Sequence, residues 1–304
     1  MRSPISLRPA AFALLMAAFA GLAFAETQTF QPSVGQDGKD VVWVPTPQVL
    51  VDTMLDMAGV SAADYVIDLG SGDGRTVITA AKRGARAVGI EYNPEMVALS
   101  KRNAEREGVA GRARFVKADL FESDFSQASV ITMFLLPEIN LKLRSKILGL
   151  KPGTRIVSNT FPAVGWDPDA TSDEPLMGDC DIWCSALLWI VPANVAGTYE
   201  TPHGHVMLNQ QNQILSGVLR TGERIFPLEG RVRGEEIGVH TGEGRGDGTM
   251  WKLLRDVRLA VRALAKAPRF TGRPLMSHQG FFAGTPLSVD VDNGLVFVPT
   301  GTPS

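Results

Sequence analysis

The sequence predicts an α/β fold, in which a mainly parallel sheet carries helices on both faces and is followed by a small β-rich appendage and a basic helix. Residues 65–91 read as strand, glycine turn, helix and strand, a unit of about 30 residues that suits a parallel crossover. Strand-like and helix-like patterns then alternate as far as residue 191. Between residues 197 and 240, turn signals recur about every ten residues, which indicates short antiparallel strands.

The first predicted strand, Tyr65–Leu69, is apolar apart from Asp68, as expected of a strand buried on both faces. Glycines follow it at alternate positions, namely Gly70, Gly72 and Gly74. Glycine allows a positive φ and lets a ligand approach the backbone closely. A dinucleotide site would have G-x-G-x-x-G, but Arg75 stands where its third glycine belongs. The alternative is an α/β protein in which the glycines serve only a tight turn.

Later elements add polar groups at predicted strand ends. Glu91 closes the second strand, 17 residues after Gly74, and Asp119 follows the third strand. Asn93 and Pro94 predict the cap and first residue of the intervening helix. Because ligands of parallel sheets lie at the carboxyl ends of strands, these carboxylates are candidate binding groups. An exposed turn carboxylate is the alternative for Asp119.

The fourth predicted strand, 128–134, leads into the segment LLPEIN, which we expect at the same sheet edge. The segment places five residues beside a bound ligand: Phe134, Leu135, Pro137, Glu138 and Asn140. A helix is predicted at 141–150, a fifth strand at 154–161 and a sixth at 183–191. Ahead of the first strand, VVWVPTP (41–47) predicts either a lid, with Thr46 also capping the next helix, or a plain connection.

Composition limits the classes of function. With 304 residues and a net charge of −2, the chain gives no global reason to expect nucleic-acid binding. Cys180 and Cys184 are a weak zinc signature, and they predict either a local disulfide or two thiols. His203 and His205 are more typical of solvated or packed histidines than of metal ligands, so we predict no metal site.

The two ends of the chain carry separate signals. Residues 1–25 predict a signal peptide: Arg2 and Arg8 precede an apolar run, and Ala23–Ala25 forms an A-x-A cleavage site. This predicts an exported, periplasmic protein, or one tethered to the inner membrane if the segment is uncleaved. Residues 26–40 predict a flexible leader.

At the other end, residues 242–304 predict a glycine-rich hinge, an amphipathic helix and a tail. The basic helix, Trp251–Lys266, predicts contact with a membrane surface or partner, or packing on its own domain.

The ordered motifs of residues 41–170 resemble the Rossmann-like class I S-adenosylmethionine (SAM) methyltransferases, whose motif I is E/D-x-G-x-G-x-G. Within that class they resemble the mitochondrial and bacterial protein-lysine methyltransferases that modify the c-subunit of ATP synthase and the adenine nucleotide carrier. The segments that carry the resemblance are VPTP (44–47), VIDLGSGDGR (66–75), AVGIEYNPEMV (87–97), EREGV (105–109), DLFESDFSQAS (119–129), LLPEINLKLRSKI (135–147), GTRIVSNTFP (153–162) and WDPD (166–169).

The resemblance implies a methyltransferase domain at 41–200, a β-rich appendage at 201–241, and SAM as cofactor. Asp68 and the turn Gly70–Ser71–Gly72–Asp73–Gly74 would hold the methionine part, Glu91 the ribose and Asp119 the adenine. Pro137, Glu138 and Asn140 would line the acceptor site, where Glu138 is either a base or a first-turn carboxylate.

The expected reaction is methyl transfer to an acceptor, foremost a protein lysine. The alternatives are a small-molecule methyltransferase and a non-catalytic exported binding protein. Export conflicts with the synthesis of SAM inside the cell.

Overall fold

The computed structural model describes residues 30–172, 180, 182–201, 204–241, 287–290 and 295–297. The chain divides into Met1–Pro32 and Ser33–Ser304, and the description below concerns the second unit. Four predictions lie outside the described residues: the signal peptide (1–25), His203, the hinge (242–248) and the basic helix (251–266).

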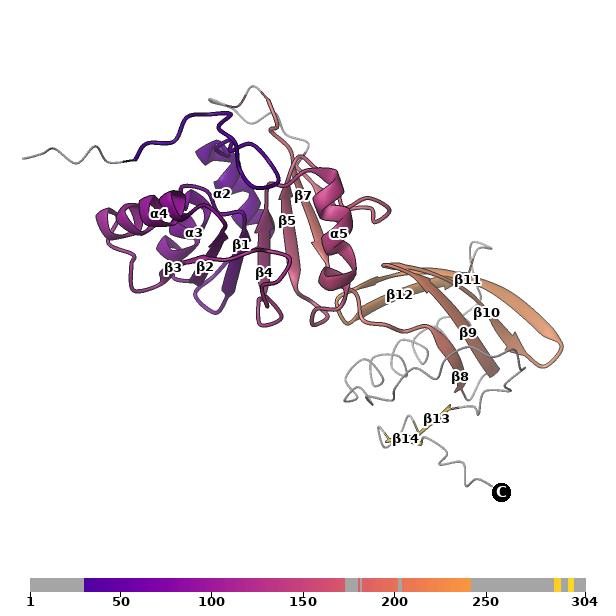
Figure 1. Ribbon diagram of the computed structural model, residues 1–304. Coiled ribbons are helices and arrows are strands. Elements are labelled where there is room, and N and C mark those ends of the chain that lie inside the picture. The colour runs from indigo at the N-terminus through magenta and orange to yellow at the C-terminus, as the bar shows by residue number, and fades with distance from the viewer. Residues whose placement is uncertain are drawn as a thin grey trace, which may run out of the picture. The chain divides into compact units, whose positions relative to one another are not determined.

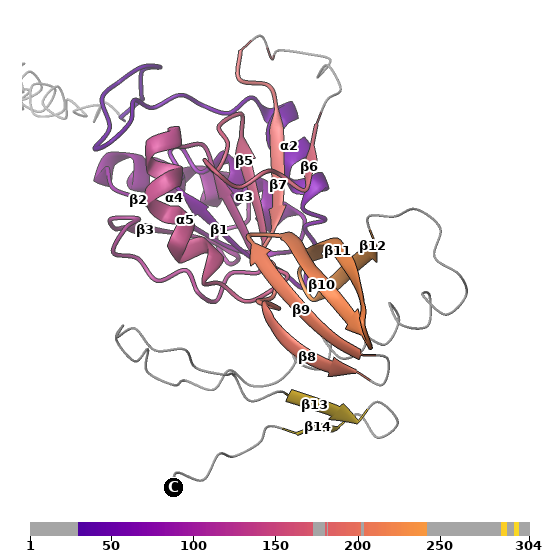
Figure 2. The same ribbon diagram turned by 90° about the vertical axis from the view of Figure 1, so that its right-hand side faces the viewer.

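The first sheet is the predicted α/β sheet, and it has the order β3-β2-β1-β4-β5-β7-β6 (Figure 1; β6 is labelled in Figure 2). Its parallel strands are β1 (Tyr65–Leu69), β2 (Arg86–Glu91), β3 (Ala113–Lys117), β4 (Val130–Met133) and β5 (Arg155–Asn159). Two antiparallel strands extend it, β7 (Ala186–Ile190) and β6 (Ala170–Thr171). The chain moves outward from β1 to β3 and returns to β4 on the other side of β1. This reversal opens a crevice at the carboxyl ends of β1 and β4.

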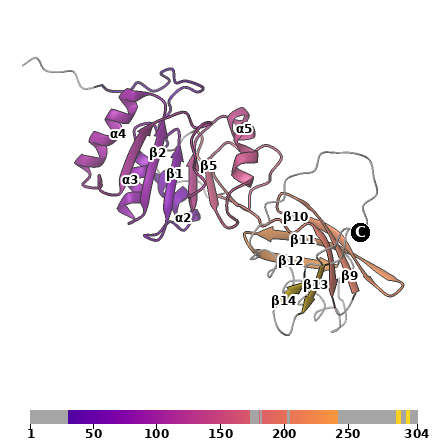
Figure 3. The same ribbon diagram turned by 60° about the horizontal axis from the view of Figure 1, so that its bottom comes forward.

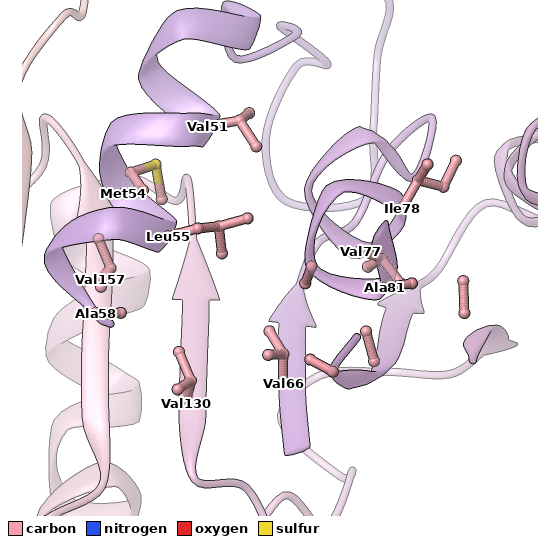
Figure 4. Close-up of a cluster of buried hydrophobic side chains, with 14 of the residues drawn as sticks. Val51, Met54, Leu55, Ala58, Val66, Val77, Ile78, Ala81, Val130 and Val157 are labelled. Atoms are coloured by element: carbon pink, nitrogen blue, oxygen red, sulfur yellow. The ribbon is translucent and has the colours of Figure 1, made fainter. Parts of the chain in front are cut away.

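Among the described residues, four helices accompany this sheet: α2 (Gln48–Met57), α3 (Arg75–Lys82), α4 (Pro94–Arg106) and α5 (Pro137–Leu148) (Figure 3). On one face, α2 and α3 pack against strand residues that include Val66, Val130 and Val157 (Figure 4). On the other face, Leu143 and Ile147 of α5 join a separate buried cluster with β1 and β4. Successive strand residues face opposite sides, so one apolar strand serves both layers. Helices on both faces were predicted, and this is confirmed.

The helix starts show which local signals were interpreted correctly. Asn93 caps α4 as predicted, since its Oδ1 accepts from the N–H groups of Glu95 at 2.8 Å and Met96 at 3.4 Å. The predicted start of α5 at residue 141 is wrong, because the helix begins at Pro137. Proline suits a first helical position, and Glu138 in the first turn complements the helix dipole.

The Thr46 cap is also wrong. The N-cap of α2 is Pro47, and the Thr46 hydroxyl instead accepts a hydrogen bond from Asn159 Nδ2 at 3.3 Å.

The second sheet has the order β12-β11-β10-β9-β8-β13-β14 (Figure 2). Its strands are β8 (Gly197–Thr201), β9 (Gly204–Gln211), β10 (Ile214–Thr221), β11 (Arg224–Arg233), β12 (Glu236–Thr241), β13 (Leu287–Asp290) and β14 (Leu295–Phe297). The β8–β12 run is antiparallel, as predicted, whereas β8 and β13 pair in parallel. The chain changes sheet between Ile190 and Gly197. The buried side chains of β9 to β12 alternate with exposed ones, so this sheet has its own apolar cluster.

Candidate functional site

A cavity of about 250 Å³ lies at the carboxyl ends of β1, β2 and β4, where the topology predicts a ligand. Its lining includes residues 36–46, the turn after β1, the segments that follow β2, β3, β4 and β5, and Trp183 ahead of β7. Seven of the eight predicted cofactor residues line it, namely Asp68, Gly70, Ser71, Gly72, Asp73, Glu91 and Asp119. The eighth residue, Gly74, does not line the cavity and packs against Phe115. A Cβ at position 74 would lie 2.7 Å from the Phe115 ring.

Asp68 is the buried acidic group of the cavity. It is 7% exposed, and its Oδ1 accepts a hydrogen bond from Thr132 Oγ1 at 2.6 Å. Burial raises the pKa of Asp68 to about 7, although the Thr132 bond opposes this rise. The negative charges of Glu91 and Asp73 raise this pKa further. A cationic ligand beside Asp68 would therefore be bound favourably, because its charge stabilises the ionised form of this carboxylate.

Glu91 is held in place by the backbone. Its Oε2 accepts from the N–H of Gly72 and its Oε1 from the N–H of Asn93, both at 2.9 Å. Each carboxylate oxygen has two lone pairs, so each retains an acceptor site toward the cavity. Two adjacent hydroxyl groups are the natural partners for such a fixed pair of oxygens.

The glycine turn is shaped by backbone conformation and by close packing. Gly70 and Gly72 have φ values of +78° and +53°, which glycine adopts without strain. A Cβ on Gly72 would lie 2.6 Å from Nε1 of Trp43, so the indole lies against the turn. Ser71 Oγ is buried without a hydrogen-bond partner among the described residues, and it lies against Gly89, where a Cβ would be 2.4 Å from it.

Residues 33–46 fold over this turn. Residues 33–40 belong to the segment predicted to be a flexible leader (26–40), and residues 41–46 belong to the segment predicted to be either a lid or a plain connection (41–47). Gly35 and Trp43 are joined by a hydrogen bond from N–H to C=O of 2.9 Å. Lys39 Nζ lies 2.9 Å from Asp119 Oδ2, and the hydrogen bond from Lys39 lowers the pKa of Asp119. Arg75 Nη1 donates to the C=O of Thr46 at 2.8 Å and also pairs with Asp73. Residues 36–46 therefore form a lid, with Pro45 and Thr46 in the cavity wall, and this is the first of the two alternatives given for 41–47.

The Lys39 contact predicts faster cofactor exchange when it is removed. Lys39→Ala deletes the ion pair between lid and rim, so we expect SAM to dissociate about three- to tenfold faster, with less salt dependence than in the wild type. Stopped-flow measurement of SAM release at two ionic strengths checks this. Lys101→Ala, at an exposed site on α4, is the matched control. Equal release rates in Lys39→Ala and the wild type would show that the ion pair does not hold the lid.

The predicted acceptor residues divide into two groups. Phe134 and Leu135 line the cavity, whereas Pro137, Glu138 and Asn140 do not appear in its described lining. Pro137 and Glu138 form the first turn of α5, and Glu138 is exposed. Asn140 is 1% exposed, and its Nδ2 lies within hydrogen-bond distance of three carbonyls, those of Leu135 (3.3 Å), Phe161 (3.2 Å) and Pro162 (3.3 Å). Asn140 therefore ties the segment after β4 to the segment after β5.

Sequence reasoning missed several residues of the cavity wall. Lys39 comes from the predicted leader (26–40), and Trp43 comes from the segment predicted as a lid or a connection (41–47). Phe161 and Trp183 come from predicted strands. The only signal near Trp183 was the cysteine pair, and Cys180 and Cys184 do form a disulfide. Among the described residues, no group of three or more histidine, cysteine or acidic side chains could hold a metal ion. His205 is exposed, with Nδ1 3.7 Å from Glu200 Oε1.

The donor set suits a ligand with an ammonium group, a diol and an apolar body. Asp68 would receive the ammonium group, Glu91 the two hydroxyls, and the lid with Leu135 the apolar part. SAM has these groups, so the residues that are present fit the cofactor implied by the motifs.

Comparison with known proteins identifies the same part of the chain. The model of the ANTKMT methyltransferase domain family matches residues 68–170. A protein-lysine N-methyltransferase of Saccharolobus islandicus (strain REY15A) is 50% identical over 131 residues, which cover 42% of this chain and 81% of the relative. The human ATP synthase subunit-C lysine N-methyltransferase is 44% identical over 110 residues, covering 36% of this chain and 47% of the relative.

The adenine nucleotide translocase lysine N-methyltransferase of Mus musculus is 36% identical over 111 residues, covering 36% of this chain and 48% of the relative. The chain thus spans about half the length of these two mammalian relatives. A solved RNA methyltransferase from Salinibacter ruber, in complex with S-adenosyl-L-homocysteine, is 45% identical. The match covers 50% of this chain and 96% of the Salinibacter ruber chain, with a TM-score of 0.46.

Proposed function

Because this chain belongs to the ANTKMT methyltransferase family, we propose that it transfers a methyl group from SAM to the side-chain amine of a lysine in a protein. The archaeal relative, which is 50% identical and 81% covered, is a protein-lysine N-methyltransferase, and the mammalian relatives act on lysines of two named proteins. The observation that carries the proposal is the pairing of buried Asp68 with backbone-held Glu91 in one cavity.

The chain's residues have mainly positioning roles in this reaction. SAM, when bound, supplies a methyl group that is already activated by a positive sulfur. Asp68 would hold the ammonium end and Glu91 the ribose. Because the cofactor is then held in place, the entropic part of the activation barrier is lower. The acceptor amine attacks with its lone pair: an N–C bond forms, and the C–S electron pair stays on sulfur. An ordinary lysine has a pKa of about 10.4, so exclusion of water by the apolar wall helps the amine to lose its proton.

The mouth of the cavity favours a protein acceptor over a small molecule. Two residues of the lining, Leu136 and Trp183, are each 41% exposed, so large apolar side chains stand at the opening. Such a surface suits a side chain that enters from a protein lying outside. A closed acceptor pocket would have favoured a small molecule.

The proposal is tested by incubating the full chain with SAM labelled in its methyl group and a protein extract from the source cells. Mass spectrometry should find the labelled methyl on a lysine, with S-adenosyl-L-homocysteine formed in equal amount. Label on small molecules alone would contradict the protein acceptor. A folded chain that binds SAM and transfers no label would favour a binding protein.

Cofactor binding should depend on pH through Asp68. Its pKa is about 7 in the folded chain, and the carboxylate form is the one that binds an ammonium group. As the pH falls below about 7, SAM must displace a proton, so affinity should weaken by up to about tenfold per pH unit. Calorimetric titration between about pH 5.5 and pH 8 measures this. A flat profile across that range would assign the ammonium to another group.

We also propose that the chain is exported, or tethered to the inner membrane if its leader is uncleaved. The basic start, apolar run and A-x-A site of residues 1–25 support this, and so does the Cys180–Cys184 disulfide, because disulfides persist in oxidising compartments. No helix among the described residues is long and apolar enough to cross a bilayer.

Fractionation of the source cells with N-terminal sequencing tests this proposal. A periplasmic chain beginning at Glu26 would support cleavage, and an intact chain in the membrane fraction would support the tether. An intact chain in the cytosolic fraction would contradict both. An exported enzyme would also need SAM outside the compartment where it is made.

A further inference from the structure

Three aromatic rings meet in the wall of the cofactor cavity. Phe134 follows β4, Phe161 follows β5, and Trp183 lies just before β7. The ring centroids of Phe134 and Phe161 are 5.8 Å apart, those of Phe134 and Trp183 are 5.9 Å apart, and those of Phe161 and Trp183 are 6.4 Å apart. The rings therefore form one cluster, hereafter the aromatic wall, assembled from three separate parts of the chain.

The backbone is strained at two points beside the aromatic wall. Thr160 and Trp183 have φ values of +55° and +57°, in the left-handed region that non-glycine residues seldom adopt. A β-branched residue there is unusual, and such strain persists only where the surroundings enforce it. The C=O of Ser185 accepts a hydrogen bond of 2.7 Å from the N–H of Thr160, so the two strained segments are bound to each other.

Further bonds hold the backbone at Phe161 and the loop that carries Trp183. The Phe161 carbonyl accepts from Ser158 Oγ at 2.8 Å and from Asn140 Nδ2 at 3.2 Å. Trp183 lies within the loop closed by the Cys180–Cys184 disulfide, next to Cys184. Trp183 is nevertheless 41% exposed, so hydrophobic burial alone does not account for its placement.

We propose that the aromatic wall is the binding surface for the cationic amine of the acceptor, with Trp183 positioned by the Cys180–Cys184 disulfide. This inference rests on the proposed function and names the part of the site that receives the acceptor. The ligand class is an alkylammonium ion. The Phe134 and Phe161 rings are nearly parallel, at 15°, and Trp183 is inclined to them by 63° and 50°, so the ring faces of the cluster point in more than one direction. A cation that lies over one of these faces, within about 6 Å of its centroid, is attracted by the ring.

An aromatic surface suits a methyl acceptor for a chemical reason. A carboxylate would attract the lysine ammonium but would also stabilise its proton through a charge-assisted hydrogen bond. Aromatic faces attract the cation without accepting its proton in this way. The amine can therefore arrive charged and pass its proton to solvent water at the open mouth beside Trp183, before its lone pair attacks the methyl carbon.

The test uses the full chain and a simple probe, the tetramethylammonium ion, with tert-butanol as an uncharged probe of similar size. We expect tetramethylammonium to bind the wild type in the presence of S-adenosyl-L-homocysteine, measured by ligand-observed NMR, and tert-butanol not to bind. Trp183→Ala should weaken this binding about fivefold or more, while Trp183→Phe retains part of it. The double variant Cys180→Ser/Cys184→Ser should fall between the wild type and Trp183→Ala.

Two controls keep the outcomes distinct. Ile182→Ala removes a neighbouring side chain that is 67% exposed, and it should leave probe binding unchanged. The midpoint of thermal unfolding and the far-ultraviolet circular dichroism spectrum, measured in the same samples, should be similar in Trp183→Ala and the wild type, which shows that the variant is folded. Equal probe binding by Trp183→Ala and the wild type, or none by the wild type, would overturn the inference. Failure of the wild type to bind SAM would overturn the proposed function instead.

Discussion

Asp68→Asn should strongly weaken SAM binding and at the same time stabilise the protein without SAM. The substitution keeps an acceptor oxygen for Thr132 but removes the negative charge that would pair with the cofactor's ammonium group. Loss of a buried charge-assisted hydrogen bond should weaken SAM affinity about 100-fold or more, as measured by calorimetry. A variant that binds SAM as tightly as the wild type would remove Asp68 from the cofactor site.

The same substitution should stabilise the free protein, although it weakens SAM binding. Burial raises the pKa of Asp68 to about 7 in the folded chain, well above its unfolded value of 3.8. The folded state thus binds an extra proton between these values, and stability without cofactor falls as pH rises through that window. At pH 8, removing the charge recovers roughly 4 kcal/mol, less about 1–3 kcal/mol for an unpaired amide. We expect a net gain of about 1–3 kcal/mol in urea unfolding.

The same unfolding experiment has an internal check, since the difference between Asp68→Asn and the wild type should shrink as the pH is lowered toward about 4. Asp56→Asn, at an exposed carboxylate that pairs with Arg83, is the matched control and should leave SAM affinity unchanged. A destabilised Asp68→Asn at pH 8 would show that the buried carboxylate has a compensating partner in the free protein.

Glu91→Gln should reduce SAM affinity about as strongly as Asp68→Asn does, but it should lower the free energy of unfolding rather than raise it. The two oxygens of Glu91 accept from the N–H groups of Gly72 and Asn93. A glutamine supplies one oxygen and one NH₂ group, so one backbone N–H would face a donor and lose its partner. We expect a cost of about 1–3 kcal/mol in unfolding free energy and about a 100-fold loss of SAM affinity.

Glu95→Gln provides the matched control for Glu91→Gln, because Glu95 is an exposed carboxylate in the first turn of α4. It should bind SAM normally. Adenosine should lose affinity for Glu91→Gln as SAM does, since the two ligands share the ribose. Normal adenosine binding by that variant would contradict the assignment of Glu91 to the ribose.

The cofactor side of the site was predictable because its residues lie close together in sequence. Asp68, the glycine turn and Glu91 belong to one βαβ unit, and a parallel crossover places the ends of its two strands side by side. The same local reasoning found the Asn93 cap. It could not place Lys39 against Asp119, since that contact joins the leader to the segment after β3.

The acceptor side was harder to predict because its geometry depends on departures from regular structure. The fifth and sixth strands were predicted to include Phe161 and Trp183, but β5 ends at Asn159 and β7 begins at Ala186. The positive φ values of Thr160 and Trp183 end the regular pattern, and sequence periodicity carries no signal for such residues. Asn140 was predicted to face the ligand because LLPEIN was placed at the sheet edge, ahead of a helix predicted to begin at residue 141. In α5 it is a buried side chain that joins two segments.

The most direct test of the central claim is a calorimetric titration of SAM into the full-length chain. One molecule of SAM should bind per chain, with micromolar affinity, and S-adenosyl-L-homocysteine should compete for the same site. Asp68→Asn and Glu91→Gln, titrated alongside, should each show little or no heat. A folded wild-type chain that binds no SAM would contradict the methyltransferase account as a whole.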